Sequence, residues 1–369
     1  MTSRIYWRFL IIAAVPISLL SVLVVCLGAW LEPLDGDLTR LGGYPENDFG
    51  WRGTQVGFSP ELAPFGVLGD SYDVVVIGDS FSIPPGVRSG EPRADRGYWT
   101  DFFVQLTGLN VGTFHREMLG PEDLLRSDAW RTAPPRLLVL EYAERNLGLV
   151  PPAAVPCEGR PDRDGPDLPR RPVPAVARTY VRDTGHRIGT TAIDASIDFL
   201  IKAVPRWVAG VNTTQVLHYD LTRSDLFSNR RAGELLVYAN ELRRARTPVA
   251  ELERVGCTLL NLQEQVEANG WTRFVLMVAP DRSVVYSAWL PGLHLPNMTA
   301  ILARTPGLQL LRLDHEMSAA AAEGVQDVYA PNDTHWASVG KQIAAEALAS
   351  FVAQGRASID PHMQGHRPW

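Results

Sequence analysis

A run of β-branched residues ends in a turn at Asp73-Val74-Val75-Val76-Ile77-Gly78-Asp79-Ser80-Phe81-Ser82. A short apolar run that stops at a turn signal is typical of a buried parallel strand. Ser80 would then follow the carboxyl end of that strand, where open α/β sheets bind their ligands. Gly-Asp-Ser is also an ordinary turn sequence, so the serine indicates chemistry only if a base lies elsewhere in the chain.

A second motif supplies that base at Asn332-Asp333-Thr334-His335-Trp336, directly before a segment with helical apolar spacing. A nucleophilic serine needs a base that takes its proton and a carboxylate that orients the base. We therefore predict Ser80 as the nucleophile, His335 as the general base and Asp333 as the orienting acid. The alternative is that Ser80 is a turn residue and that Asp333 caps the following helix.

Four segments together resemble the SGNH (GDSL-type) hydrolases and acyltransferases, and most of all the alginate O-acetylation branch that includes AlgJ and AlgX. The resemblance is carried by residues 78–82, 140–145, 279–286 and 333–336. In that branch the D-x-H motif precedes the serine motif, whereas here the serine comes first, as in ordinary GDSL esterases. The resemblance implies a three-layer α/β/α fold with a mostly parallel sheet and a Ser-His-Asp mechanism that passes through an acyl-enzyme.

The resemblance also implies donors for an oxyanion, which the tetrahedral intermediate of acyl transfer requires. The backbone N–H of Ser80 is one. A glycine after the second strand would be another, for which we choose Gly112, with Gly120 as the alternative. Asn146 would match the asparagine that follows the third strand in SGNH enzymes.

Two further residues are candidates for substrate binding. Arg145 would hold an acetyl oxygen or a sugar hydroxyl, and its alternative is a surface ion pair with Glu144, which would contribute little. Trp336 would line the pocket and stack on a sugar ring, or else belong to the core. Asp79 is expected to hold the serine turn through backbone hydrogen bonds.

The alternation of apolar runs and helical patterns predicts an α/β sheet. We expect strands at residues 73–77, 136–141, 271–278 and 308–313. A further short strand, the second along the chain, is expected to end near residues 110–112. We expect helices at 98–107, from 121, within 175–207, at 233–269 with a break at Pro248, and at 339–353. The corresponding division is a membrane anchor (1–31), a linker that packs on the domain (32–70), the SGNH-like domain (71–353) with a helical or irregular insertion at about 150–235, and a polar tail (354–369).

The amino-terminal segment is expected to cross a membrane. Residues 9–30 contain no charged side chain, which is enough for a membrane-spanning helix. Arg4 and Arg8 precede the segment, so the amino terminus is expected in the cytoplasm and the domain in the periplasm, on a single-pass anchor in the inner membrane. A cleaved signal peptide is the alternative, although the apolar run is long and no A-x-A site follows it.

Only three cysteines occur. Cys26 lies in the predicted anchor, so Cys157 and Cys257 are left to form one disulfide or to remain two separate thiols. The formal charge of −6 and the lack of a basic stripe give no case for nucleic acid. The sequence has no metal-ligand or nucleotide motif, so neither a metal nor a cofactor is implied.

These observations predict an exported O-acetyltransferase whose partners are a carbohydrate polymer, an acetyl donor and, by resemblance, a multi-pass membrane protein that supplies the acetyl group. The alternatives are a carbohydrate acetylesterase and a non-catalytic polysaccharide-binding or assembly subunit that keeps the fold.

Overall fold

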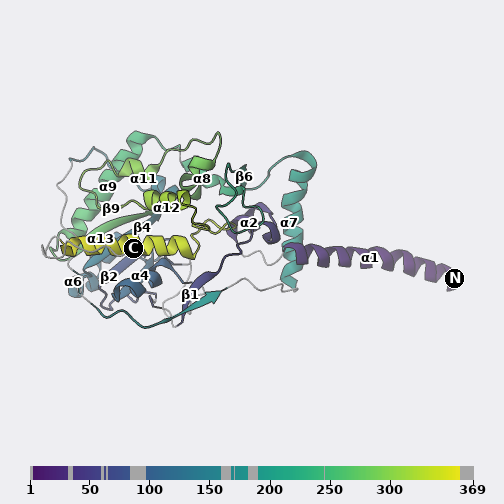
Figure 1. Ribbon diagram of the computed structural model, residues 1–369, viewed down its shortest axis with the longest axis horizontal. Coiled ribbons are helices and arrows are strands. Elements are labelled where there is room, and N and C mark those ends of the chain that lie inside the picture. Colours follow the sequence, from purple (N-terminus) through teal and green to yellow (C-terminus); the bar gives the residue numbers. More distant parts are fainter. Residues whose placement is uncertain are drawn as a thin grey trace. The chain divides into compact units, whose positions relative to one another are not determined.

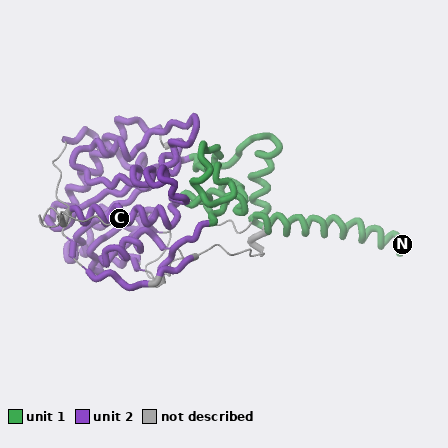
Figure 2. The backbone as a smooth tube through the Cα atoms, viewed as in Figure 1, with its two compact units in different colours: residues 1–52, 183–239, 330–334 green, residues 53–182, 240–329, 335–369 purple. Residues whose placement is uncertain are grey.

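The computed structural model describes residues 3–31, 36–59, 62–63, 65–83, 97–158, 168–169, 171–181, 190–244 and 246–357. The chain forms two compact units (Figure 2). Unit 1 comprises residues 1–52, 183–239 and 330–334, and unit 2 comprises residues 53–182, 240–329 and 335–369. The predicted tail lies outside the described residues from position 358 onward.

Unit 2 is built on a five-stranded sheet in which every pairing is parallel (Figure 1). Its order is β3 (Val111–His115), β2 (Val74–Gly78), β4 (Leu137–Ala143), β8 (Arg273–Ala279) and β9 (Leu310–Leu311). This arrangement confirms the predicted α/β class with a parallel sheet. Because β2 and β4 lie next to each other near the centre, the segments that follow them meet at one edge of the sheet.

Both faces of the sheet are covered, which explains why its strands are continuously apolar. One face packs against α5 (Pro121–Arg126), α9 (Val249–Glu267) and α11 (Met298–Leu302). On the other side, α12 (Leu313–Ala322) contacts β8 and α13 (Ser338–Ala357), and α13 contacts α4 (Trp99–Thr107). The result is the expected three-layer arrangement.

The remaining elements of unit 2 are short. They are β1 (Gln55–Ser59), which pairs antiparallel with β5 (Ala177–Val181), and α6 (Asp128–Thr132), η1 (Glu144–Leu149), α10 (Arg282–Val285) and η2 (Ser287–Trp289). The helix α8 (Ala239–Arg244) begins at the last residue of a unit 1 segment.

Unit 1 contains α1 (Ser3–Leu31), α2 (Asp37–Gly42), α3 (Glu46–Phe49), α7 (Thr190–Ala209) and the antiparallel pair β6 (Val216–Asp220) and β7 (Glu234–Tyr238). Its core brings together Leu38, Tyr44 and Phe49 with Val216 and Leu236. The predicted linker at 32–70 is therefore partly wrong, because α2 and α3 pack with the later segment of unit 1. Residues Ile5–Leu31 form a helix that is long and apolar enough to span a membrane, with a mean hydropathy of 2.9.

Three predicted elements differ from the structure. The second strand begins near Val111 rather than ending there, and the fifth is reduced to Leu310–Leu311. The helix predicted from residue 233 starts as strand β7, because the apolar residues 235–237 are all buried in pairing with β6. Helix and strand patterns are hard to separate in so short an apolar run.

Candidate active site

Residues 78–82, called the serine turn below, follow β2 at the carboxyl edge of the sheet. The N–H groups of Ser82 and Ile83 both donate to the carbonyl of Asp79 at 3.0 Å, which closes the chain into a tight turn. The Asp79 side chain caps the turn, since its Oδ1 accepts the N–H of Phe81 at 3.3 Å and its Oδ2 accepts the N–H of Ala143 at 2.9 Å. These contacts are the backbone hydrogen bonds expected of Asp79.

Beneath the turn lies Glu141, which is fully buried in β4. Its Oε2 accepts the backbone N–H of Asp79 at 2.9 Å and the hydroxyl of Ser82 at 3.0 Å. The indole N–H of Trp99 donates to the same hydroxyl at 2.9 Å. Gly78 leaves room for this arrangement, because a Cβ there would lie 2.6 Å from both Glu141 Oε2 and Ser82 Oγ.

Two features favour the uncharged form of Glu141. Burial raises the pKa of its carboxyl well above the usual range, and the neighbouring Asp79 raises that pKa further. Within the described residues, its Oε1 is buried without a hydrogen-bond partner, which is much less costly for a neutral carboxyl than for a carboxylate. Sequence reasoning did not single out Glu141 as a site residue, although a carboxyl inside an apolar strand was a usable signal.

His335 meets Ser80 in unit 2. Its Nε2 lies 2.8 Å from Ser80 Oγ, although the two residues are 255 positions apart in the sequence. Both side chains are half-buried. The Phe81 ring lies 4.8 Å from the imidazole, centroid to centroid, and supports it from the serine turn. The predicted nucleophile and base are therefore within hydrogen-bond reach, which is the geometry that proton transfer between them requires.

Asp333 belongs to unit 1 and His335 to unit 2, because the boundary between the units follows Thr334. Within unit 1, Asp333 Oδ2 accepts the N–H of Asp37 at 3.2 Å, and the N–H of Thr334 donates to Asp37 Oδ1 at 2.7 Å. These bonds fix the backbone of the loop immediately before His335.

Asn146, predicted as an oxyanion donor, lies beside the serine turn. It follows β4 in η1, and its Nδ2 donates to Asp79 Oδ2 at 3.0 Å. The carboxylate of Asp79 thus ties the serine turn to the segment after β4, through Asn146 and Ala143.

Arg145 forms a buried ion pair with Asp281, its Nη1 lying 3.0 Å from Asp281 Oδ1. The side chain is only 11% exposed, and its guanidinium lies 5.5 Å from the centroid of the Phe81 ring. Although burial alone would lower the pKa of this guanidinium, the charge of Asp281 raises the pKa overall. A buried pair of this kind connects the segments after β4 and β8.

The alternative in which Glu144 and Arg145 form a surface ion pair is wrong. Glu144 is fully buried, and it accepts the backbone N–H groups of Asp281 (3.0 Å), Met298 (2.7 Å) and Thr299 (3.2 Å). Burial raises the pKa of Glu144 to about 7, against the effect of these three donors, which lower it.

Gly112 does not lie near Ser80, so its prediction as an oxyanion donor is wrong. It pairs with Val75 at the start of β2, whereas the turn follows Gly78, and a Cβ on Gly112 would meet the ring of Tyr72. The error followed from placing the end of the second strand too early. Gly120, the alternative, caps the amino end of α5, after the carboxyl end of β3.

Trp336 is a core residue and does not line the site. It is 2% exposed, its ring centroid lies 4.7 Å from that of Phe81, and its indole N–H donates to the Tyr329 hydroxyl at 2.9 Å. A sugar could not stack on a ring buried in this way, and the alternative reading of the sequence, that Trp336 belongs to the core, is correct.

Residues 236–365 match the family model described as "SGNH hydrolase-like domain, acetyltransferase AlgX". The match includes the D-x-H motif and leaves out the serine turn. A search of curated proteins finds no match.

Proposed function

We propose that the chain, whose residues 236–365 match the model of an SGNH hydrolase-like domain, is an extracytoplasmic O-acetyltransferase that acts on a polysaccharide. The observation that carries the proposal is the 2.8 Å separation of Ser80 Oγ and His335 Nε2. A serine hydroxyl becomes an effective nucleophile when a positioned imidazole accepts its proton during attack.

In the first half-reaction, the Ser80 oxygen attacks the carbonyl carbon of the donor's acetyl ester while His335 takes the hydroxyl proton. The tetrahedral intermediate then expels the donor oxygen, which receives that proton from His335. Acetyl-Ser80 is left, with His335 neutral again.

In the second half-reaction, His335 takes a proton from a hydroxyl of the polysaccharide as that oxygen attacks acetyl-Ser80. Collapse of this intermediate breaks the bond to Ser80 Oγ, and His335 returns the proton to the serine. The acetyl group is now an ester of the sugar.

Asp333 orients His335 in this proposal. Two residues of chain span at most ~7 Å, so the Cα atom of Asp333 lies within that distance of the Cα of His335. The oxyanion is stabilised by the Ser80 N–H, with Gly120 and Asn146 as further donors. Arg145 holds the loop that carries Asn146, and it contacts substrate only if the site opens.

The proposed location outside the cytoplasm has two supports. The helix Ile5–Leu31 suits an anchor or a signal sequence, and Cys157 is bonded to Cys257, as is usual in oxidising compartments. An acetyl donor outside the cytoplasm requires a supplier, for which a multi-pass membrane protein of the inner membrane is the expected partner.

A carbohydrate acetylesterase is the second candidate. It shares every step up to acetyl-Ser80, after which water replaces the sugar. The order of the motifs, with Ser80 before Asp333 and His335, favours this candidate because ordinary GDSL esterases have the same order.

The deciding experiment incubates the full-length chain with a chromogenic acetyl ester, with and without oligosaccharide acceptors, and follows the products by mass spectrometry. Acetylated sugar that disappears in Ser80→Ala supports the transferase, and acetate alone supports the esterase. If the ester is not turned over and a serine-directed phosphonate does not label Ser80, the chain is a non-catalytic binding subunit.

A further inference from the structure

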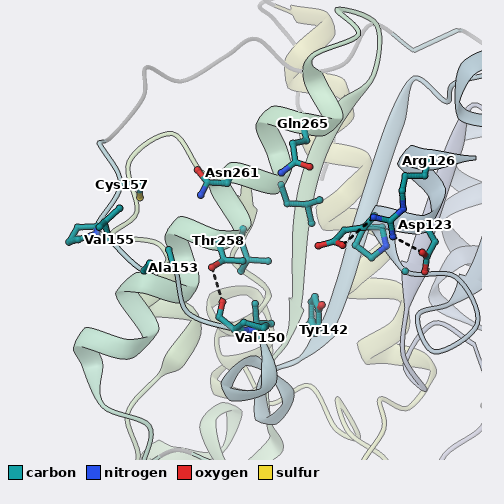
Figure 3. Close-up of a pocket in the computed structure, with 18 residues that line it drawn as sticks. Asp123, Arg126, Tyr142, Val150, Ala153, Val155, Cys157, Thr258, Asn261 and Gln265 are labelled. Atoms are coloured by element: carbon teal, nitrogen blue, oxygen red, sulfur yellow. Dashed lines mark hydrogen bonds and ion pairs between the residues drawn. The ribbon is translucent and has the colours of Figure 1, made fainter.

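A cavity of about 620 Å³ lies in unit 2 between α5 and α9, and residues 150–157 form one of its walls (Figure 3). This volume is within the range of roughly 300–1,000 Å³ that is usual for small-molecule sites. We call this cavity the α5–α9 groove.

The lining of the groove is amphipathic. Its base is apolar, formed by buried Leu259 with half-buried Leu262 and Tyr142, which pack on the core of the sheet. One rim consists of hydrogen-bonding side chains on a single face of α9, at the helical spacing i, i+3, i+7. These are Thr258, Asn261 and Gln265, and Figure 3 shows them along the helix.

The opposite rim comes from the first turns of α5 and is charged. It carries two carboxylates, Glu122 and Asp123, against one guanidinium, Arg126. Arg126 pairs with both acids, at 3.8 Å and 2.8 Å. The charged side chains that line the groove therefore leave it with a negative balance.

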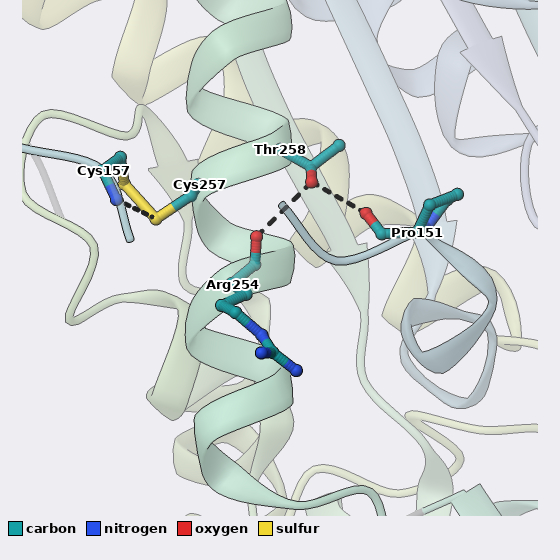
Figure 4. The surroundings of a disulfide bond; sticks show 5 residues. All are labelled: Pro151, Cys157, Arg254, Cys257 and Thr258. Carbon is teal, nitrogen blue, oxygen red and sulfur yellow. Dashed lines mark hydrogen bonds between the residues drawn. A yellow bond between two sulfur atoms is a disulfide. The ribbon is translucent and has the colours of Figure 1, made fainter. Parts of the chain in front are cut away.

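The wall at 150–157 is fastened to α9 along its length (Figure 4). Three contacts hold it: the disulfide Cys157–Cys257, the bond from Thr258 Oγ1 to the carbonyl of Pro151 at 2.7 Å, and the bond from the N–H of Ala153 to the carbonyl of Arg254 at 3.1 Å. A wall tied in this way loses little conformational freedom when a ligand binds, which favours affinity.

The groove adjoins the residues that support the serine turn. Tyr142 lines its base, and the next residue, Ala143, donates its N–H to Asp79 Oδ2 at 2.9 Å. Gly120, the candidate oxyanion donor at the start of α5, lines the same groove. The groove therefore reaches two residues near the carboxyl edge of the sheet, Tyr142 at the end of β4 and Gly120 after β3.

We infer that the α5–α9 groove binds a short stretch of a neutral polysaccharide, the acceptor of the acetyl group. The inference deepens the proposed function and rests on it. A pyranose ring has apolar C–H faces bordered by hydroxyl groups, which matches an apolar base with amide, hydroxyl and carboxylate rims. The negative balance of the charged lining disfavours a polyuronate through like-charge repulsion.

The test is isothermal titration calorimetry on the full-length chain in detergent micelles. The probes are the neutral tetrasaccharides cellotetraose and mannotetraose, and the anionic tetragalacturonate. We expect at least one neutral probe to bind, and to bind more tightly than the anionic one. The inference is overturned if no neutral probe binds, or if tetragalacturonate binds as tightly as the better of the two.

The double variant Asn261→Ala/Gln265→Ala removes two hydrogen-bonding side chains from the rim, which we expect to weaken neutral-probe binding by about tenfold. Glu253→Ala is the matched control, because Glu253 is exposed on α9 and does not line the groove. Both variants should keep the wild-type unfolding temperature. Equal affinities in the wild type and the double variant would overturn the inference.

Product analysis separates this inference from the proposed function. With the chromogenic donor and the bound tetrasaccharide, the ratio of acetylated sugar to acetate should fall about tenfold in the double variant. If the tetrasaccharide binds in the groove but Ser80 never becomes acetylated, the proposed function fails and the binding site stands. If Ser80 is acetylated but no neutral probe binds, the groove inference fails alone.

Discussion

At the level of single residues, buried carboxyl groups hold the serine turn in place. Glu141 accepts hydrogen bonds from Asp79 and Ser82 below the nucleophile, and Asp79 ties the turn to the segment after β4. Glu144 fastens the same region to the amino end of α11. Each carboxyl replaces solvent contacts with fixed bonds, as a preorganised site requires.

We predict that Glu141→Gln keeps most of the Ser80 acylation rate, whereas Glu141→Ala lowers it by about 10- to 100-fold through the loss of two hydrogen bonds. The reason is that burial raises the pKa of Glu141 well above its usual range, which favours the neutral acid, and a neutral amide of the same shape can accept both bonds through its oxygen. The measurement is the rate at which a serine-directed phosphonate labels Ser80. Equal losses in the two variants would show that the carboxyl is needed in its ionised form.

Glu144 should make stability depend on pH. Its pKa is raised to about 7 in the folded chain, above its value in the unfolded chain, so the folded state binds more protons between these values. The contribution of Glu144 to the free energy of unfolding is therefore fully present below about pH 4.5 and is lost as the pH rises through about 7. This contribution is at most about 3 kcal/mol.

The measurement is urea unfolding of the wild type and of Glu144→Gln between pH 5 and 8. Glu144→Gln should be less stable than the wild type at low pH, because its amide N–H₂ faces the N–H of Asp281. The gap between the two should narrow as the pH rises. A constant gap over this range would contradict the prediction.

Among the elements, β2, β4 and α9 set the geometry of the site. The parallel pairing of β2 with β4 brings the serine turn next to Asn146, and α9 carries both the rim of the groove and one half of the disulfide. Gly78 at the end of β2 is where the strand, the turn and Glu141 approach most closely.

Gly78→Ala is expected to displace the serine turn, since the new Cβ would lie 2.6 Å from Glu141 Oε2 and from Ser82 Oγ. We predict at least a roughly tenfold loss of phosphonate labelling, equivalent to one lost hydrogen bond or more. Gly233→Ala serves as the control, because the nearest atom to its Cβ would be 3.7 Å away. Normal labelling of Gly78→Ala would contradict the close packing described above.

The disulfide closes a separation of 100 residues between the wall at 150–157 and α9. Replacing both cysteines by serine should lower the free energy of unfolding by about 2–5 kcal/mol. Urea unfolding with and without reductant measures the effect, and Cys26→Ser is the control because Cys26 is not bonded. A double variant as stable as the wild type would show that the hydrogen bonds alone hold the wall.

For the whole molecule, the question is how the chain is held in its compartment. Unit 1 carries the apolar helix α1 and unit 2 carries the sheet with Ser80 and His335. Each unit is assembled from separate segments of the chain, so neither can be cut out as a continuous piece.

We predict that the full chain stays in the membrane fraction after alkaline carbonate extraction, because the apolar helix is long enough to span the bilayer. The mass of the purified protein should include residue 3 onward. A mature protein that starts after about residue 31 and is released by carbonate would show that the helix is a cleaved signal sequence.

The sequence alone predicted what depends on local pattern: the first, third and fourth strands of the sheet, the amino-terminal apolar helix, and the two motifs with Ser80 and His335. β-branched runs, turn residues and helical spacing are fixed by neighbouring positions, and they can be read without knowing what packs against them. The resemblance to the SGNH family could be seen in the sequence because the motifs that carry it are equally short.

Only the tertiary structure decided which residues meet. Ser80 and His335 are in contact at 2.8 Å, and Cys157 is bonded to Cys257, although each pair is far apart in the sequence. Long-range packing also buries Trp336, and strand pairing places Gly112 near the amino end of its strand, away from Ser80. The alternatives at each of these positions were locally allowed. Long-range packing and strand register selected one of them, and neither can be read from neighbouring residues.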